Sequence, residues 1–253
     1  MGPDQSAVGF PFGMGLRLPV DGSPTRQETV EVRWFRRGRL PESVLEWFGA
    51  AGADVEIRED VYLVAAELPN LSVKIRGGEQ LDVKVFRGSL GDERVPGRAR
   101  GWIDCWEKWT FPFSSAVPQF PPRSGWVVVG KERRLRSFVL VDGVAVPAGR
   151  GGGDPECAVE LTAVLLGGKP WWTLGFEAMG STDGRRAVLD AAAAEIFDRP
   201  LPDGLRLQLT SSNSYAALLR KIPLGKRRRR GRGHRRPDEI DAGSLRQVGD
   251  PSR

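Results

Sequence analysis

Several short segments of this sequence carry charged side chains at every second position. Residues 31–33 (EVR), 74–76 (KIR) and 131–133 (KER) are the clearest of them. Because alternate side chains of a β-strand point to the same face of a sheet, each segment directs its charged positions to one side. Charges that line a common interior surface cost too much desolvation to serve stability alone. The pattern therefore predicts a sheet with a charged inner face that polyanions and metal ions balance.

Strand-like alternation recurs along most of the chain, and helical periodicity is confined to three short stretches. Strands are predicted at residues 29–35, 55–63, 71–76, 81–86, 100–113, 125–141, 156–166 and 171–177. Helices are predicted at residues 41–48, 183–197 and 213–221. Eight strands at hairpin spacing with three short helices favour an antiparallel barrel over a parallel α/β fold. The expected fold class is mainly β (α+β).

Composition divides the chain into three parts. Residues 1–27 are rich in Gly and Pro and predict a disordered leader, and residues 28–222 are expected to form one barrel domain. Residues 223–253 contain ten of the 38 Lys and Arg residues and four of the 32 Asp and Glu residues, which accounts for the whole net charge of +6. The basic character of the chain therefore belongs to a tail that is predicted to be disordered.

The few cysteine and histidine residues limit the cellular compartment and the kinds of catalysis that can be expected. Cys105 and Cys157 are the only cysteines, so we expect two unpaired thiols in a cytoplasmic protein. No stretch approaches the ~20 apolar residues of a membrane span, and no association with a membrane is expected. His234, the only histidine, lies in the tail, so histidine acid–base catalysis and histidine metal ligands are excluded from residues 28–222.

Six segments in order resemble motifs of the CYTH superfamily, the triphosphate tunnel metalloenzymes. Residues 29–33 (TVEVR) stand in the place of that family's ExExK strand, and residues 131–133 stand in the place of its K-x-R strand. The other four are residues 58–63 (REDVYL), similar to R-x-D-x-Y, 160–162 (ELT) and 175–177 (GFE) at the late carboxylate pairs, and 214–219 (SYAALL), close to a shared ending. The resemblance implies an eight-stranded antiparallel tunnel barrel that handles triphosphates with Mg²⁺ or Mn²⁺.

The resemblance also implies the roles of individual residues. Thr29, Thr162 and Gly175 replace carboxylates of the family pattern, and Arg33 replaces its lysine. The three acidic residues that survive are the predicted catalytic residues and metal ligands, namely Glu31, Glu160 and Glu177. The predicted phosphate contacts are Arg33, Lys74, Arg76, Lys84, Lys108, Lys131 and Arg133. Mg²⁺ needs only one or two carboxylates besides water and phosphate oxygens, so three glutamates suffice for one ion.

Three functional hypotheses follow from the sequence. The first is a divalent-metal-dependent hydrolase of an inorganic or organic triphosphate, and the second is a catalytically degenerate barrel that binds a polyphosphate or nucleotide. The third is a nucleic-acid-associated protein whose residues 226–236 (KRRRRGRGHRR) supply non-specific affinity through counterion release. Tripolyphosphate, thiamine triphosphate, nucleotides and RNA 5′ ends present the same charges, and the sequence does not choose among them.

Overall fold

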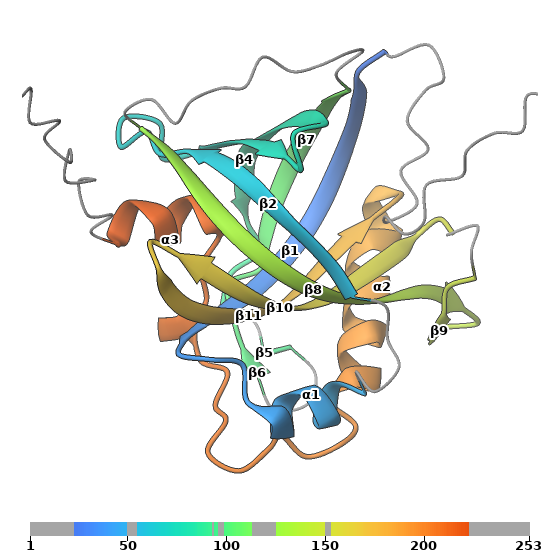
Figure 1. The fold of residues 1–253 in the computed structure, drawn as a ribbon. Coiled ribbons are helices and arrows are strands. Elements are labelled where there is room, and N and C mark those ends of the chain that lie inside the picture. Colours follow the sequence, from blue (N-terminus) through green and yellow to red (C-terminus); the bar gives the residue numbers. More distant parts are fainter. Residues whose placement is uncertain are drawn as a thin grey trace, which may run out of the picture.

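The computed structural model of the protein describes residues 23–49, 55–92, 94–95, 99–112, 125–149 and 153–222. These residues form a barrel with three helices around it (Figure 1). The barrel strands are β1 (Thr25–Arg37), β2 (Val55–Leu63), β3 (Leu71–Arg76), β4 (Gln80–Ser89), β7 (Asp104–Pro112), β8 (Trp126–Val141), β10 (Glu156–Leu166) and β11 (Lys169–Met179). The other elements are α1 (Glu42–Phe48), β5 (Arg94–Val95), β6 (Ala99–Arg100), β9 (Val144–Pro147), α2 (Thr182–Ile196), a 3-10 turn (Leu209–Ser211) and α3 (Tyr215–Lys221).

The eight barrel strands are antiparallel and close on themselves. Their order is β10-β11-β1-β7-β4-β3-β2-β8, and β8 pairs with β10 to complete the circle. A two-residue turn of Gly167 and Gly168 joins β10 to β11, and both residues have positive φ angles of 57° and 76°. Such primed turns match the twist of the strands and favour glycine, which adopts positive φ angles without steric cost. The turn fixes the register that places Glu160 opposite Gly175.

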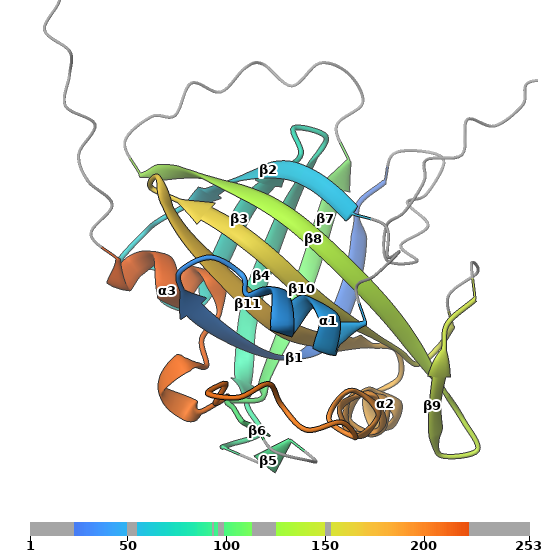
Figure 2. The same ribbon diagram turned by 60° about the horizontal axis from the view of Figure 1, so that its bottom comes forward.

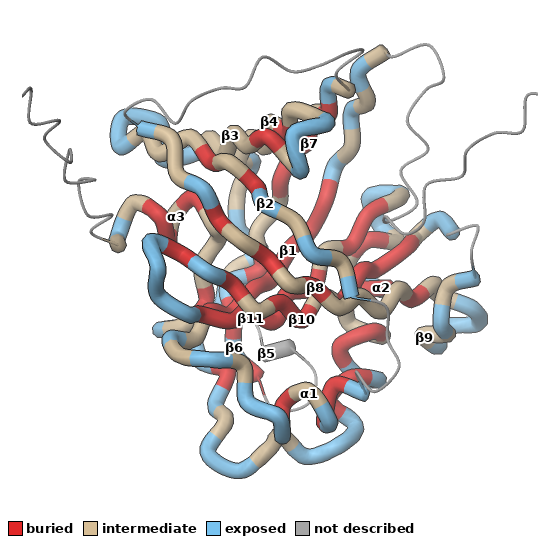
Figure 3. The backbone as a smooth tube through the Cα atoms, in the orientation of Figure 1, coloured by how far each residue is buried: buried red, intermediate tan, exposed pale blue. Residues whose placement is uncertain are grey.

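The apolar core lies outside the barrel wall. Val32 and Trp34 on the outer face of β1 pack with Phe176 of β11 and Leu189 of α2, and all four are buried. α1 and α2 cover this side of the barrel, and Figure 3 shows buried residues concentrated along β1, β10, β11 and α2. The apolar faces of the helices are buried against the outer face of the strands. The apolar core therefore does not need the inner face of the barrel, and polar residues can line it.

One end of the barrel is closed by α3. Leu218 and Leu219 of α3 pack against Phe35, Val129 and Trp171, which point inward near that end of the strands. In Figure 2, α3 lies across the end of the barrel where β11 begins. The polar part of the interior therefore lies beyond this apolar plug.

The structure confirms the predicted antiparallel eight-stranded barrel with a few short helices. The predicted bounds of β2, β3 and β10 agree with the structure, whereas β1 begins at Thr25 and continues to Arg37. Sequence reasoning missed the short strands β5, β6 and β9, which lie outside the barrel circle. Cys105 and Cys157 are free thiols. None of the helices in the described ranges has the length and apolar composition needed to cross a bilayer.

The close approach of Gly101 to Val32 and Trp34 of β1 generates the first testable prediction. A methyl group on Gly101 would lie 2.5 Å from Val32 Cγ2 and 2.8 Å from Trp34 Cζ2, inside the buried core. Overpacking of this kind costs about 1–3 kcal/mol. We expect Gly101→Ala to lower the free energy of unfolding in urea by this amount.

Gly149→Ala is the matched control, because nothing lies within 4 Å of its added methyl group. Its free energy of unfolding should stay within about 0.5 kcal/mol of wild type. Equal stability of the two variants would show that the contact of Gly101 with Trp34 is not tight in solution.

Candidate functional site

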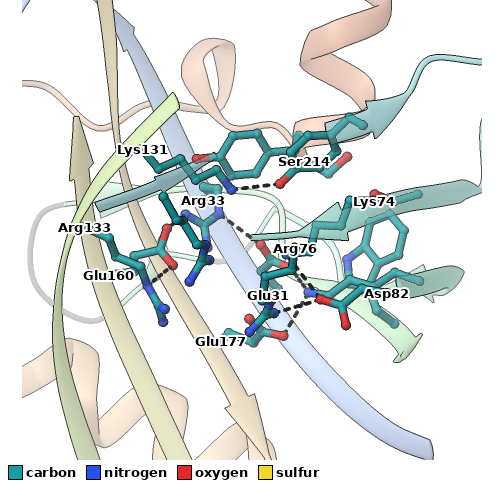
Figure 4. Close-up of a pocket in the computed structure, with 16 residues that line it drawn as sticks. Glu31, Arg33, Lys74, Arg76, Asp82, Lys131, Arg133, Glu160, Glu177 and Ser214 are labelled. Atoms are coloured by element: carbon teal, nitrogen blue, oxygen red, sulfur yellow. Dashed lines mark hydrogen bonds and ion pairs between the residues drawn. The ribbon is translucent and has the colours of Figure 1, made fainter. Parts of the chain in front are cut away.

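Charged side chains from the inner faces of the strands converge on one cavity inside the barrel (Figure 4). Its cavity volume is about 50 Å³, and the larger space of about 630 Å³ around the lining side chains includes open solvent. Seven basic and four acidic side chains line it: Arg33, Arg58, Lys74, Arg76, Lys84, Lys131 and Arg133, with Glu31, Asp82, Glu160 and Glu177. Tyr62, Ser72, Trp106, Ser214 and Tyr215 complete the lining. The cavity is therefore cationic overall.

Glu31 and Glu177 share a single cation. They are directly opposite each other on β1 and β11. Lys84 Nζ lies 2.9 Å from Glu31 Oε2 and 2.8 Å from Glu177 Oε1. Lys84 belongs to β4, which is separated from β1 by β7, so its side chain reaches across the interior. The two carboxylates thus hold an ammonium group between them.

Glu160 is paired with two arginines. Arg33 Nη1 lies 2.8 Å from Glu160 Oε1, and Arg133 Nε lies 2.7 Å from Glu160 Oε2. Arg33 reaches Glu160 across Gly175, which is the cross-strand neighbour of both residues. A Cβ atom at position 175 would lie 2.5 Å from Arg33 Cζ. The absent side chain of Gly175 is therefore what allows this ion pair.

On the opposite wall, Asp60 and Asp82 hold a larger group of cations. Lys131 Nζ donates to Asp60 Oδ2 at 2.7 Å, and Arg76 Nη2 lies 2.8 Å from Asp82 Oδ2. Lys74 lies between the two carboxylates, with Nζ 3.8 Å from Asp60 and 3.4 Å from Asp82. Three cations on two carboxylates leave this wall with surplus positive charge, although Arg58, which also contacts Asp60, is shared with Glu56.

Lys108 is a further buried lysine on the inner face of the barrel, on β7 next to β4. It faces Lys84 across β4 and β7, and the residue is 2% exposed. Within the described part of the chain no hydrogen bond or ion pair reaches its ammonium. Burial, reinforced by the charge of Arg76, lowers the pKa of Lys108 to about 7. Burial also lowers the pKa of Lys131 to about 7, since Asp60 offsets only part of the cost.

The carboxylates of the cavity remain ionised. Burial opposes their ionisation, but Lys84 and Lys108 hold the pKa of Glu177 below its usual range. Arg33 and Arg133 do the same for the pKa of Glu160, and Lys131 and Lys74 for that of Asp60. At neutral pH the interior therefore carries charges of both signs, with Lys108 and Lys131 partly deprotonated because their pKa values are about 7.

Two tyrosines form the floor of the cavity next to α3. Tyr62 and Tyr215 stack with ring centroids 5.3 Å apart, and Lys131 Nζ lies 4.1 Å from the centroid of Tyr215. Lys131 also donates to Tyr62 Oη at 2.9 Å. Aromatic faces stabilise a buried cation through their quadrupoles, so this floor helps to keep Lys131 in place.

Several buried donors at the cavity have no protein partner among the described residues. They are Trp106 Nε1, Arg76 Nε and Tyr215 Oη. Buried donors are nearly always hydrogen-bonded in folded proteins. Their position in the lining of a cationic cavity favours a ligand with several acceptor oxygens.

The structure places all the predicted site residues on the inner face of the barrel. Glu31, Glu160, Glu177 and six of the seven predicted phosphate contacts line the cavity. The seventh, Lys108, lies on the same inner face opposite Lys84 but is not part of the cavity lining. Their roles in binding and catalysis stay predictions. The basic segment 226–236, the leader up to residue 22 and the proposed nucleic-acid contact lie outside the described residues.

Sequence reasoning did not assign a role to other residues of the cavity. Asp60 and Tyr62 lie in the segment that resembles R-x-D-x-Y, and Tyr215 lies in the ending that resembles SYxxLL, but none was selected. Asp82 was missed, although it stands two positions before Lys84 and the alternation indicates a common face. Asp104 was missed too; it faces Glu31 across β1 and β7, and burial raises its pKa to about 6.

The predicted Mg²⁺ or Mn²⁺ can be compared with the arrangement of these donors. Glutamate oxygens are suitable ligands for either ion. Five of the six carboxylate oxygens of Glu31, Glu160 and Glu177 already contact a cation of the chain. In the described ranges no three acidic, His or Cys side chains are spaced to hold a metal ion. This arrangement does not fit a bound divalent ion, and the metal remains a sequence-based prediction.

Comparison with known proteins finds only weak similarities, and these are to solved structures. No family model matches the sequence, and no curated protein matches it with significance. Among solved structures, the PH1819 protein of Pyrococcus horikoshii OT3 is 12% identical over 76% of this chain and 97% of that chain, with a TM-score of 0.39. The S. pombe Pct1 RNA triphosphatase, solved with the Spt5 CTD, is 9% identical over 69% and 78% of the two chains, with a TM-score of 0.27. Likenesses this low carry no argument about fold or activity.

The lowered pKa of Lys108 generates a prediction about stability. The folded state releases the lysine proton at about pH 7, whereas the unfolded chain keeps it up to the ordinary value of 10.5. The unfolded state therefore binds more protons between these values, and this residue makes the free energy of unfolding rise with pH. We expect Lys108→Met to be more stable than wild type below about pH 7, by an amount on the order of a few kcal/mol, with the difference shrinking towards alkaline pH.

Urea unfolding at several pH values measures this difference. Lys169→Met, an exposed substitution at the start of β11, is the control and should follow the wild-type pH profile. A constant difference between Lys108→Met and wild type across the pH range would contradict the assigned cost of burying this charge.

Proposed function

We propose that the barrel binds a triphosphate or a longer polyphosphate in its interior cavity. The observation that carries this proposal is the surplus of cations around Asp60 and Asp82, where Lys74, Arg76 and Lys131 converge. Lys108 adds to this surplus from the inner face of the neighbouring strand β7. Buried cations in excess of carboxylates destabilise a fold unless a ligand neutralises them. Of the hypotheses raised by the sequence, the polyphosphate-binding barrel agrees best with this charge distribution.

A phosphate chain suits the shape of the cationic wall. Lys74 and Arg76 project side by side from β3, and Lys131 approaches from β8 beyond β2, so the positive groups follow a curved line across three strands. A triphosphate carries three to four negative charges along a flexible chain and offers acceptor oxygens to several donors. Arginine meets such oxygens with a planar fork of donors, and lysine with a compact charge. Fixed cations bind these oxygens without reorganising, because Asp60 and Asp82 already hold them in position.

Calorimetric titration of the full chain with tripolyphosphate tests the proposal. Lys131→Met and Arg76→Met each remove one charged donor from the cationic wall. Each should weaken binding by on the order of tenfold to a hundredfold, the value of a charge-assisted hydrogen bond.

Arg134→Met is the matched control, because Arg134 is adjacent to Arg133 on β8 but pairs with Glu132 on the outer face. It should bind within about twofold of wild type. Equal weakening by the inner and outer variants would mean that the ligand binds to surface charge and not in the barrel.

A phosphate-release assay separates this binding function from the metal-dependent hydrolase that the sequence also predicts. We expect saturable binding of tripolyphosphate without release of phosphate above background when Mg²⁺ or Mn²⁺ is added. Release that requires either ion and disappears in Glu177→Gln, measured over tripolyphosphate, thiamine triphosphate and nucleoside triphosphates, would establish the hydrolase instead.

A further inference from the structure

We infer that cations of the chain itself, chiefly Lys84 and Arg33, replace a divalent metal ion in this barrel. The inference deepens the proposed function, on which it rests for the nature of the ligand. It assigns Glu31, Glu160 and Glu177 the role of holding these cations in position. Binding of a polyphosphate is then independent of divalent metal.

The first step of the argument is the position of Lys84. Its ammonium lies between Glu31 and Glu177, at 2.9 and 2.8 Å from one oxygen of each. All three side chains are at most 15% exposed. A metal ion bound by this pair would need the same oxygens and the same space, and an ammonium and a divalent cation cannot both occupy it.

Arg33 provides the second step. Its guanidinium bridges Glu31 Oε1 at 3.0 Å and Glu160 Oε1 at 2.8 Å, and it fills the side-chain space above Gly175. Arg133 contacts the remaining oxygen of Glu160 and also Glu56, which Arg58 contacts in turn. With these residues included, four cations face four glutamates, and a divalent ion added to this neutral cluster would bring two uncompensated charges.

The third step concerns sequence positions that depart from the family pattern. A carboxylate at position 175 would collide with Arg33, whose Cζ would lie 2.5 Å from the new Cβ atom. Thr162 donates to Glu160 Oε1 at 2.9 Å, so a hydroxyl group stands where a second carboxylate would add charge. Gly175 and Thr162 thus have one physical explanation. A carboxylate at either position would add negative charge to a cluster whose charges are already balanced by cations of the chain.

Titration of the ligand-free full chain with Mn²⁺ tests the inference. Wild type should show no saturable binding, because its glutamates are occupied. Lys84→Ala removes the shared ammonium and leaves Glu31 facing Glu177, so it should gain a Mn²⁺ site at least about tenfold tighter than any binding by wild type. Lys84→Ala combined with Glu177→Gln should lose that site again.

Lys74→Ala is the matched control, since it removes an equally buried lysine that pairs with Asp60 and Asp82 and not with the three glutamates. It should gain no Mn²⁺ site. Saturable Mn²⁺ binding by wild type that Glu31→Gln abolishes, or a folded Lys84→Ala variant that gains no site, would overturn the inference.

A second measurement covers the case in which Lys84→Ala does not fold. Wild type is titrated with tripolyphosphate in EDTA and in Mg²⁺, and affinity in EDTA should be at least as high as in Mg²⁺. A loss of about tenfold or more in EDTA would overturn the inference while leaving polyphosphate binding established. Absence of binding in both buffers would refute the proposed function, and the Mn²⁺ titration of wild type would still decide the origin of the internal charge balance.

Discussion

Charge buried inside a closed barrel has to be neutralised, and in this protein two of the neutralising contacts join strands that are not neighbours. Lys84 of β4 reaches Glu31 and Glu177 on β1 and β11, and Arg33 of β1 reaches Glu160 on β10. Each pair ties opposite or separated parts of the wall together through the interior. The interior is therefore held by directional contacts between fixed charges, whereas the apolar core that stabilises the fold lies outside the wall.

The separation of the apolar core from the charged interior explains why the barrel tolerates a cationic cavity. The outer face of β1, β10 and β11 buries its apolar side chains beneath α1 and α2, and α3 closes one end with Leu218 and Leu219. Stability can come from these surfaces without any contribution from the cavity. The lowered pKa values of Lys108 and Lys131 show that burying these two charges lowers the free energy of unfolding, because the folded state favours the neutral form of each lysine. Sites that retain such a cost are commonly those with a function.

The acidic residues of the interior have two distinguishable arrangements. One network contains equal numbers of glutamates and cations, namely Glu31, Glu56, Glu160 and Glu177 with Arg33, Arg58, Lys84 and Arg133. Asp60 and Asp82 are outnumbered by the cations around them. In the first arrangement the glutamates hold the cations in position. In the second the surplus positive charge around Asp60 and Asp82 favours binding of an anion. The proposed polyphosphate would therefore meet the wall of β2, β3 and β8 more directly than the three glutamates.

The amino-acid sequence was enough to predict the eight barrel strands, their side-chain alternation and hence which charged residues share a face, although it missed β5, β6 and β9. Segments such as 131–133 place Lys131 and Arg133 inside and Glu132 outside because the side-chain period of a strand is two, and this local rule needs no knowledge of neighbours. Tertiary structure decided which charges meet. Only the closure of β8 onto β10 and the passage of Lys84 across the interior show that the glutamates hold chain cations, and only the register around Gly175 shows why Arg33 reaches Glu160. Contacts between strands far apart in sequence depend on barrel order and register, which the period of each strand leaves open.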